Sequence, residues 1–239
     1  MHDAELHCHT LYSKGSVQPI ECQTSVFELL SIAKKRGLHM IAITDHNTMA
    51  GYFAAKSLAK QMGIILVPAE EIDVKEGGHI LAYGIHKEIR SNQPARRVVE
   101  QIHDQGGIAI IAHPYDILHP MNALDDIIDD VDGIDFFWMG IINKRKAQST
   151  LKARMSNKLF TIGSDAHTKR LIGAFRMVFS DACNTASDYM RAMREHKCIM
   201  QIAIPYGEAL FLGLLHIVHM ALVNLIYRFS PPLASKTAT

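Results

Sequence analysis

Residues 39–46 read HMIAITDH, an apolar run of strand-forming residues that ends on an aspartate and a histidine. Two later stretches have the same design, IAIIAHP at residues 108–114 and LFTIGSDAH at residues 159–167. AELHCH at residues 4–9 ends a similar run on paired histidines, and IILVPAEE at residues 64–71 ends on two glutamates. Ionisable side chains are costly in a protein interior unless they are paired or bind a metal ion. Packing alone therefore does not explain their repeated placement after apolar runs.

These runs alternate with longer segments whose apolar residues recur with the period of a helix. The predicted strands are Ala4–His9, His39–Thr44, Ile64–Val67, His79–Ile85, Ile108–Ala112, Ile134–Phe137 and Leu159–Gly163. The predicted helices are Thr24–Arg36, Thr48–Met62, Gln93–Gln105, Lys144–Asn157 and Ser187–His196. The alternation predicts an α/β fold, and seven strands favour a closed or nearly closed TIM-like barrel; a doubly wound open sheet is the alternative.

The composition excludes some partners and favours one compartment. With 25 Lys and Arg against 24 Asp and Glu, the net charge is +1, so no overall field attracts nucleic acid or an anionic membrane. The four cysteines form no CxxC pair, and the N-terminus does not have the pattern of a secretory leader. We therefore expect reduced thiols in a cytoplasmic protein.

The composition changes after residue 204, which divides the 239-residue chain into a barrel domain, residues 1–204, and a C-terminal segment, residues 205–239. Ala209–Tyr227 contains no Asp, Glu, Lys or Arg. As a helix it would be about 28 Å long, close to the thickness of a bilayer core. Its two histidines and one asparagine make spanning costly, so burial on the barrel and membrane contact both remain open.

The 14 histidines are the most informative residues, because many of them stand at predicted strand ends. His7 and His9 are two residues apart and share one face of a strand. In βα barrels, loops at the carboxyl ends of the strands assemble the active site, and His79 alone stands at the start of its strand. The candidate ligands are six imidazoles and two carboxylates: His7, His9, His46, Glu71, His79, His113, Asp165 and His167. That number predicts two or three divalent ions, Zn, Mn or Fe, with a carboxylate bridging two of them. Glu70 is the alternative to Glu71 as the bridge.

Taken in order, these motifs resemble those of the PHP (polymerase and histidinol phosphatase) superfamily. The resemblance runs from residue 7 to residue 167, extends faintly to residue 204, and implies a distorted (β/α)7 barrel with a two- or three-metal phosphoesterase centre. It implies that one ion is held by four residues, His7, His9, Glu71 and Asp165. Glu71 would bridge to a second ion on His79 and His113, and His46 and His167 would face a third ion or the leaving group.

One residue departs from the family's common HTxxSDG motif, because Lys14 stands where the family has aspartate. A cation cannot serve as a ligand in place of a carboxylate, so we expect a two-ion centre in which Lys14 contacts a substrate phosphate. Arg170 and Arg176 are further candidates for phosphate contacts, with a solvated basic surface as the alternative.

The expected reaction is hydrolysis of a phosphoester in a small phosphorylated metabolite or nucleotide. Asp165 belongs to the catalytic centre, and His46 or His167 is expected to protonate the leaving oxygen. A nuclease acting on polynucleotide ends is one alternative, which a single Trp and the lack of an aromatic-basic stripe make less favoured. A non-catalytic metal-binding barrel, tethered to a membrane by its C-terminal helix, is the other.

Overall fold

The computed structural model describes residues 1–14, 21–116, 120–136, 158–180 and 182–205, together with scattered positions between 207 and 225. The strands are β1 His2–Cys8, β2 Leu38–Ile43, β3 Ile65–Val67, β4 Ala69–Asp73, β5 His79–Tyr83, β6 Ile108–Ile111, β7 Gly133–Phe136, β8 Leu159–Ile162, β9 Phe175–Phe179 and β10 Cys198–Ile202. The helices are α1 Val26–Lys35, α2 Ala50–Met62, α3 Ala95–Asp104, α4 Leu124–Ile127 and α6 Ala186–Arg194.

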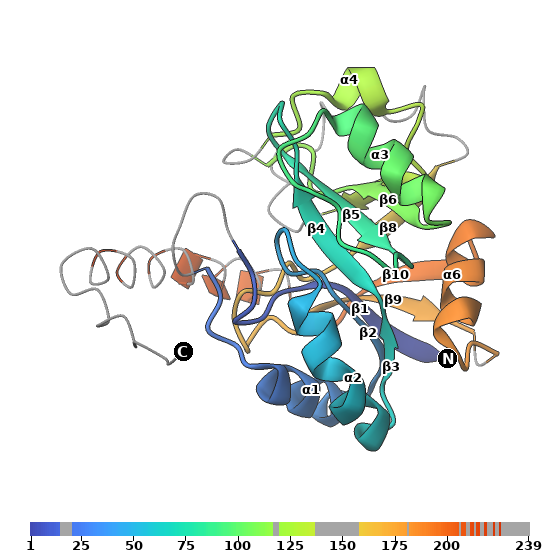
Figure 1. The fold of residues 1–239 in the computed structure, drawn as a ribbon. Helices are drawn as coiled ribbons and strands as arrows, with labels where there is room; N and C mark the ends of the chain where they lie inside the picture. Colours follow the sequence, from blue (N-terminus) through green and yellow to red (C-terminus); the bar gives the residue numbers. More distant parts are fainter. Residues whose placement is uncertain are drawn as a thin grey trace, which may run out of the picture.

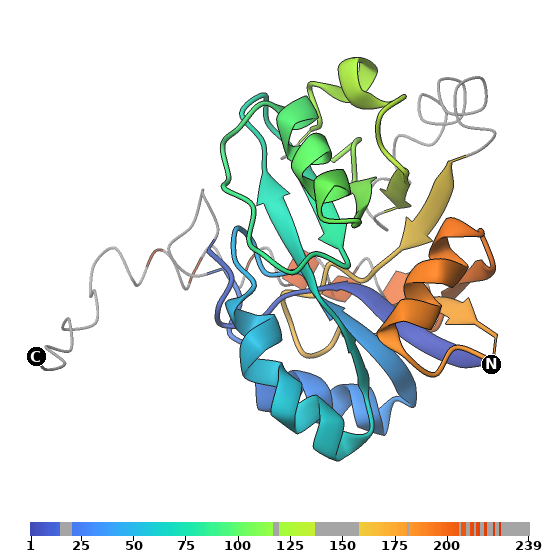
Figure 2. The same ribbon diagram turned by 45° about the vertical axis from the view of Figure 1, so that its right-hand side comes forward.

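The strands form two five-stranded sheets, in the orders β10-β9-β1-β2-β3 and β4-β5-β6-β7-β8. Figure 1 shows α1 and α2 beside the first sheet and α3 and α4 beside the second, and Figure 2 shows the same arrangement after rotation. Strands β1, β2 and β3 are parallel to one another, as are β6, β7 and β8. By contrast, β5 runs antiparallel to both β4 and β6. The expected α/β class is confirmed.

Two isolated bridges connect the sheets, and both lie next to the candidate ligands. Cys8, between His7 and His9, pairs with Ala166, and His46 pairs with Glu71. In the first bridge, the His9 N–H donates to the Ala166 carbonyl (3.2 Å) and the Ala166 N–H donates to the His7 carbonyl (3.3 Å). In the described part of the chain, the hydrogen-bonded strands thus form two sheets that are joined by short bridges, and not one continuous barrel.

Each of the seven predicted strands is present, with ends that differ from the prediction by at most two residues. Three strands were not predicted: β4, β9 and β10. β4 reads AEEID, and three carboxylates in five residues do not look like a buried strand. Four of the five predicted helices are present, and the fifth, Lys144–Asn157, lies outside the described residues.

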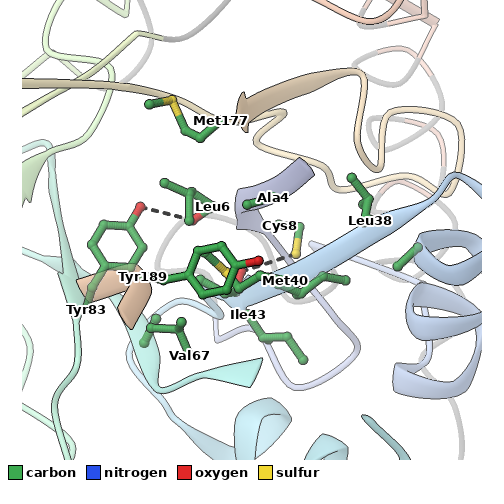
Figure 3. Packing of buried hydrophobic residues seen from close by; sticks show 14 of the residues in the cluster. Ala4, Leu6, Cys8, Leu38, Met40, Ile43, Val67, Tyr83, Met177 and Tyr189 are labelled. Atoms are coloured by element: carbon green, nitrogen blue, oxygen red, sulfur yellow. Dashed lines mark hydrogen bonds between the residues drawn. The ribbon is translucent and has the colours of Figure 1, made fainter. Parts of the chain in front are cut away.

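The packing fixes the sheets in position beneath the ligands. Helix α1 begins with a capping box between Ser25 and Glu28 and buries Val26, Leu29, Leu30 and Ala33. The larger apolar cluster joins side chains of both sheets, among them Leu6 of β1 and Tyr83 of β5. Figure 3 shows the Tyr83 hydroxyl donating to the Leu6 carbonyl, at 2.9 Å. This bond ties β5 to the strand that carries His7.

The expected C-terminal helix falls mostly outside the described residues. The described positions between 207 and 225 are helical. Within the parts of the chain that the structure covers, no helix is both long and apolar enough to cross a membrane. The domain boundary at residue 204 and the position of Ala209–Tyr227 stay predictions.

Candidate metal centre

All the predicted ligands meet at one end of the strands, where the two sheets join. His7 and His9 come from the end of β1, His46 from the end of β2, and Glu71 from β4. His79 begins β5, which is antiparallel to its neighbours, so the start of this strand lies at the same end as their carboxyl termini. His113 follows β6, and Asp165 and His167 follow β8.

Glu71 is the centre of the cluster and is fully buried. One carboxylate oxygen, Oε2, lies near imidazole nitrogens from β1 and β2, and the other, Oε1, lies near those from β5 and β6. The distances are 3.0 Å to His7 Nε2, 3.3 Å to His9 Nε2, 3.3 Å to His46 Nε2, 3.1 Å to His79 Nδ1 and 3.3 Å to His113 Nε2. A carboxylate with ligand nitrogens on both oxygens has the placement of a bridging ligand.

Asp165 is the second carboxylate of the centre. Its Oδ1 lies 3.1 Å from His9 Nε2, 3.4 Å from His7 Nε2 and 3.4 Å from His167 Nδ1. Asp165 (φ 44°) and His113 (φ 24°) both have positive φ, a conformation that is uncommon outside glycine. Strain of this kind is maintained where the surrounding structure enforces it, and it often accompanies a functional site.

The donor set fits divalent ions. Four groups of residues place their ligand atoms within 4.8 Å of one another: His7, His9, Glu71 and Asp165; Glu71, His79 and His113; His46, Asp73 and His79; His9, His46 and His167. Ligand atoms about 2.1 Å from a tetrahedral ion stand about 3.4 Å apart. The measured separations around Glu71 and Asp165 agree with this value. The structure therefore brings together all eight predicted ligands.

The charges of the centre are strongly coupled. Burial raises the pKa of Glu71, but the imidazoles of His46 and His7 outweigh it and hold that pKa well below its usual range. The pKa of Asp165 is also held well below its usual value, because His7 and His167 more than offset burial. Burial opposes protonation of His46, yet nearby carboxylates raise its pKa to about 10. The carboxylates are thus ionised at neutral pH and available as ligands.

Hydrogen bonds between the loops after β1 and β2 keep the ligands in position. The Thr10 N–H and hydroxyl both donate to Asp45, at 2.6 Å each. A Cβ at Gly51, on α2, would stand 1.9 Å from Asp45 Oδ2, so a larger residue at this position would displace the carboxylate. Asp45 therefore accepts both hydrogen bonds from Thr10 and holds the loop that follows His9 in place.

Two carboxylates orient the ligands and were not predicted. Asp135 on β7 is fully buried, with Oδ2 3.2 Å from His7 Nδ1 and Oδ1 accepting from the Thr161 hydroxyl at 2.7 Å. Asp73 Oδ1 lies 3.1 Å from His46 Nδ1. Both follow the alternation of their strands, Asp135 as the charged residue within GIDF and Asp73 two residues after Glu71. That alternation was the available signal.

Replacing Asp135 with asparagine is expected to weaken metal binding by about 10–100-fold, because the amide no longer fixes the tautomer and orientation of His7. Metal titration of the purified variant measures this, with Asp104→Asn, an exposed aspartate on α3, as the matched control. An Asp135→Asn variant with the metal affinity of the control would show that His7 does not depend on this contact.

Of the three predicted phosphate contacts, none is placed among the ligands. The Lys14 side chain is exposed, and its backbone N–H donates to the His46 carbonyl at 3.0 Å. Arg170 is exposed on the loop that follows His167. Arg176 Nη1 pairs with Asp3 at 2.8 Å, near the start of β1 and so at the opposite end of this strand from His7. The structure thus does not bring Arg176 to the centre, because β9, which carries it, pairs with the start of β1.

Glu70, the alternative bridge, faces away from the ligands. Its Oε1 accepts from the Ile89 N–H at 2.6 Å, and among the described residues no group hydrogen-bonds to its Oε2. Burial raises its pKa to about 8, so the folded protein holds this carboxyl protonated at neutral pH.

This shift has a consequence for stability. Between pH 4.5 and pH 8 the folded state keeps a proton on Glu70 that the unfolded chain releases, so the group's contribution to the free energy of unfolding falls as pH rises. Relative to Glu70→Gln, the wild-type protein is expected to lose about 4 kcal/mol between pH 5 and pH 8. Denaturant unfolding of both metal-free proteins measures this difference, and parallel pH profiles would contradict the shift.

Comparison with known proteins identifies one matching family. The PHP domain model matches residues 5–202. Among curated relatives, the uncharacterized protein MJ1587 of Methanocaldococcus jannaschii is 36% identical over 169 residues, which cover 66% of this chain and 96% of the relative.

Two shorter matches are to proteins of known activity. A 5'-3' exoribonuclease of Haemophilus influenzae is 35% identical over 82 residues, 34% of this chain and 26% of that protein. A phosphoribosyl 1,2-cyclic phosphate 1,2-diphosphodiesterase of Eggerthella lenta is 34% identical over 89 residues, 35% of this chain and 31% of that protein. The chain thus matches about a quarter to a third of the length of these two relatives.

Solved structures share the fold at low sequence identity. PsfC from Pseudomonas syringae superposes with a TM-score of 0.67 at 16% identity, covering 92% of this chain and 98% of that one. A two-domain protein from Bacteroides vulgatus with a predicted PHP-like metal-dependent phosphoesterase gives 0.64 at 13% identity, with coverages of 84% and 64%. Endonuclease Q from Pyrococcus furiosus gives 0.59 at 18% identity, with coverages of 85% and 58%.

Proposed function

Because this chain belongs to the PHP domain family, we propose that it is a metal-dependent phosphoesterase that hydrolyses a small phosphorylated metabolite or nucleotide. The observation that carries the proposal is the position of Glu71, a buried carboxylate with five imidazole nitrogens within 3.3 Å of its two oxygens. A carboxylate in a structural ion pair needs only one such partner. A carboxylate that bridges two metal ions needs further metal ligands beside each of its two oxygens.

The proposed ligand sets share Glu71. His7, His9 and Asp165 would hold one divalent ion with Glu71 Oε2, and His79 and His113 would hold a second with Glu71 Oε1. Zn, Mn and Fe all suit a set of imidazoles and carboxylates. Divalent ions in such a site activate water as a nucleophile at neutral pH and stabilise the charge that develops on phosphoryl oxygens.

The protein's own groups position the substrate and the proton. Of the exposed cations beside the centre, we propose that Lys14 and Arg170 contact the substrate phosphate. His46 and His167 border the site, and the carboxylate of Asp165 helps to raise the pKa of His167 above its usual value despite burial. Their two proposed roles are donation of a proton to the leaving oxygen and coordination of a third ion.

A substrate screen tests the proposal. Metal-loaded protein is assayed against mononucleotides, sugar phosphates and short oligonucleotides, each with and without chelator. We expect hydrolysis of a small phosphate ester with weak dependence on salt. The match to an exoribonuclease over 82 residues is the reason for including oligonucleotides. If only oligonucleotides are cleaved, at a rate that falls steeply with salt, the nuclease alternative is favoured instead. Metal binding without any turnover would contradict the enzyme proposal.

A further inference from the structure

Glu5 lies in the middle of β1 and is fully buried. Its carboxylate accepts three hydrogen bonds, and each of them comes from a backbone N–H group. Oε1 accepts from the His7 N–H at 3.1 Å and from the Ser164 N–H at 3.0 Å, and Oε2 accepts from the Gly173 N–H at 2.7 Å. Ser164 and Gly173 stand at the two ends of the loop between β8 and β9. Glu5 thus joins β1 to both ends of this loop.

The loop between β8 and β9 carries two of the candidate ligands, Asp165 and His167. Asp165 directly follows Ser164 and has a φ of 44°, which a non-glycine residue keeps only where its surroundings enforce it. The Ser164 hydroxyl donates to the Phe175 carbonyl at 3.3 Å and accepts from the Phe175 N–H at 3.1 Å. The residue before Asp165 is therefore held by Glu5 through its backbone and by Phe175 through its side chain.

The middle of the same loop is held by α1. Arg36, which follows the last residue of this helix, donates from its guanidinium group to the carbonyls of Arg170 and Ile172. Within the described ranges no Lys or Arg side chain forms an ion pair with Glu5, so backbone donors offset the cost of burying its carboxylate. Packing of β1 alone would not require a carboxylate at this position. The geometry of the loop does, because its two ends present N–H groups to the interior.

We propose that Glu5 is a positioning residue for the Glu71 centre, and that it holds His7 and Asp165 at the separation at which both can bind one ion. His7 Nε2 lies 3.4 Å from Asp165 Oδ1. A single oxygen, Glu5 Oε1, accepts from the His7 N–H and from the N–H of Ser164, the residue before Asp165, so the two ligand segments share one anchor. The inference rests on the proposed function, because His7 and Asp165 belong to its first ligand set.

Glu5→Gln tests the proposal. An amide has one acceptor oxygen and an NH₂ group that cannot accept, so at least one of the three N–H groups loses its partner in either orientation of the amide. Mn²⁺ is titrated into the metal-free full-length protein, and free Mn²⁺ is followed by electron paramagnetic resonance. Asp132→Asn is the matched control, because Asp132 also accepts from a backbone N–H, that of Ala109 at 2.7 Å, near the start of β6. Thermal unfolding of each metal-free protein is measured beside it.

Wild-type protein and Asp132→Asn are expected to bind Mn²⁺ with the same affinities. In Glu5→Gln one ion is expected to bind about 10–100-fold more weakly, as for other groups that orient a ligand, while the ion on His79 and His113 keeps its affinity. A merely structural role would lower the unfolding temperature and leave both affinities of the folded protein unchanged, which would overturn the proposal. Equal weakening of both ions would also overturn it, because the hydrogen bonds of Glu5 reach only the first ligand set.

Glu5→Asp is measured if Glu5→Gln does not fold. It keeps the carboxylate but is shorter by one CH₂ group, so it cannot reach His7 and both ends of the loop at once, and the same selective loss of affinity is expected. Failure of both variants to fold would overturn the proposal, since Glu5 would then be required for the fold and not for the placement of ligands. Selective weakening of one ion without hydrolysis of any phosphoester by the wild-type protein would instead contradict the proposed function and leave this inference standing.

Discussion

Replacing Glu71 with glutamine is expected to lower metal affinity and the rate of hydrolysis by more than about a hundredfold each. The substitution removes the charge from a carboxylate that contacts five imidazoles, and an amide offers one weak acceptor where the centre requires two. Loss of a bridging ligand affects both ions, so the effect exceeds the 10–100-fold typical of groups that only orient a ligand. Bound metal and the rate constant are measured on the same preparation.

Glu70→Gln is the control for this prediction, because it changes the neighbouring residue in the same way. The Glu70 carboxyl has a pKa of about 8, so glutamine replaces a group that is already mostly neutral at pH 7. Metal content and activity are expected to stay within a factor of about two of the wild-type values, since no ligand changes. The opposite result, with Glu70→Gln inactive and Glu71→Gln active, would show that Glu70 is the bridge.

Asp165→Asn is expected to abolish hydrolysis and to reduce bound metal while the fold is retained. Asp165 is a direct partner of His7, His9 and His167, and its carboxylate balances their charge in a buried site. His9→Ala tests the same ion from β1, since His9 Nε2 approaches both carboxylates. Metal content, rate and the circular dichroism spectrum are measured together. Full activity in a stably folded His9→Ala variant would contradict the proposed ion on His7, His9, Asp165 and Glu71.

The sequence was sufficient to predict the α/β class and the eight residues that the structure brings together at the strand ends, because strand ends and ionisable residues coincide in it; their role as ligands stays a prediction. His79 is the one candidate that the sequence placed at the start of a strand. It stood at the wrong end of its strand only on the assumption that every strand is parallel. β5 is antiparallel to β4 and β6, which places the start of β5 beside the carboxyl ends of the others. Strand direction depends on long-range pairing, which periodicity along one segment does not report.

The residues that the sequence did not reveal act through contacts between distant segments. Asp135 reaches His7 from 128 residues away, and Asp73 reaches His46 from 27. Glu5 lies within a predicted strand, but its partners on the loop between β8 and β9 are 159 and 168 residues away. Arg176 was a candidate for the opposite reason: its position after the last motif suggested the site, but β9 returns along β1 and delivers the guanidinium to Asp3. Where a strand runs back antiparallel along an earlier one, as β9 does along β1, residues that follow a motif in sequence lie far from it in space.

The most direct test of the account is removal and restoration of metal with phosphoester hydrolysis as the readout. Wild-type protein is treated with chelator, assayed, and reloaded with Mn²⁺ or Zn²⁺ in steps while bound metal is counted. The account predicts that hydrolysis is lost with the metal and returns only as the positions around Glu71 fill, and that Glu71→Gln regains none. Hydrolysis that persists in metal-free protein, or fully loaded protein that hydrolyses no phosphoester, would contradict the central claim.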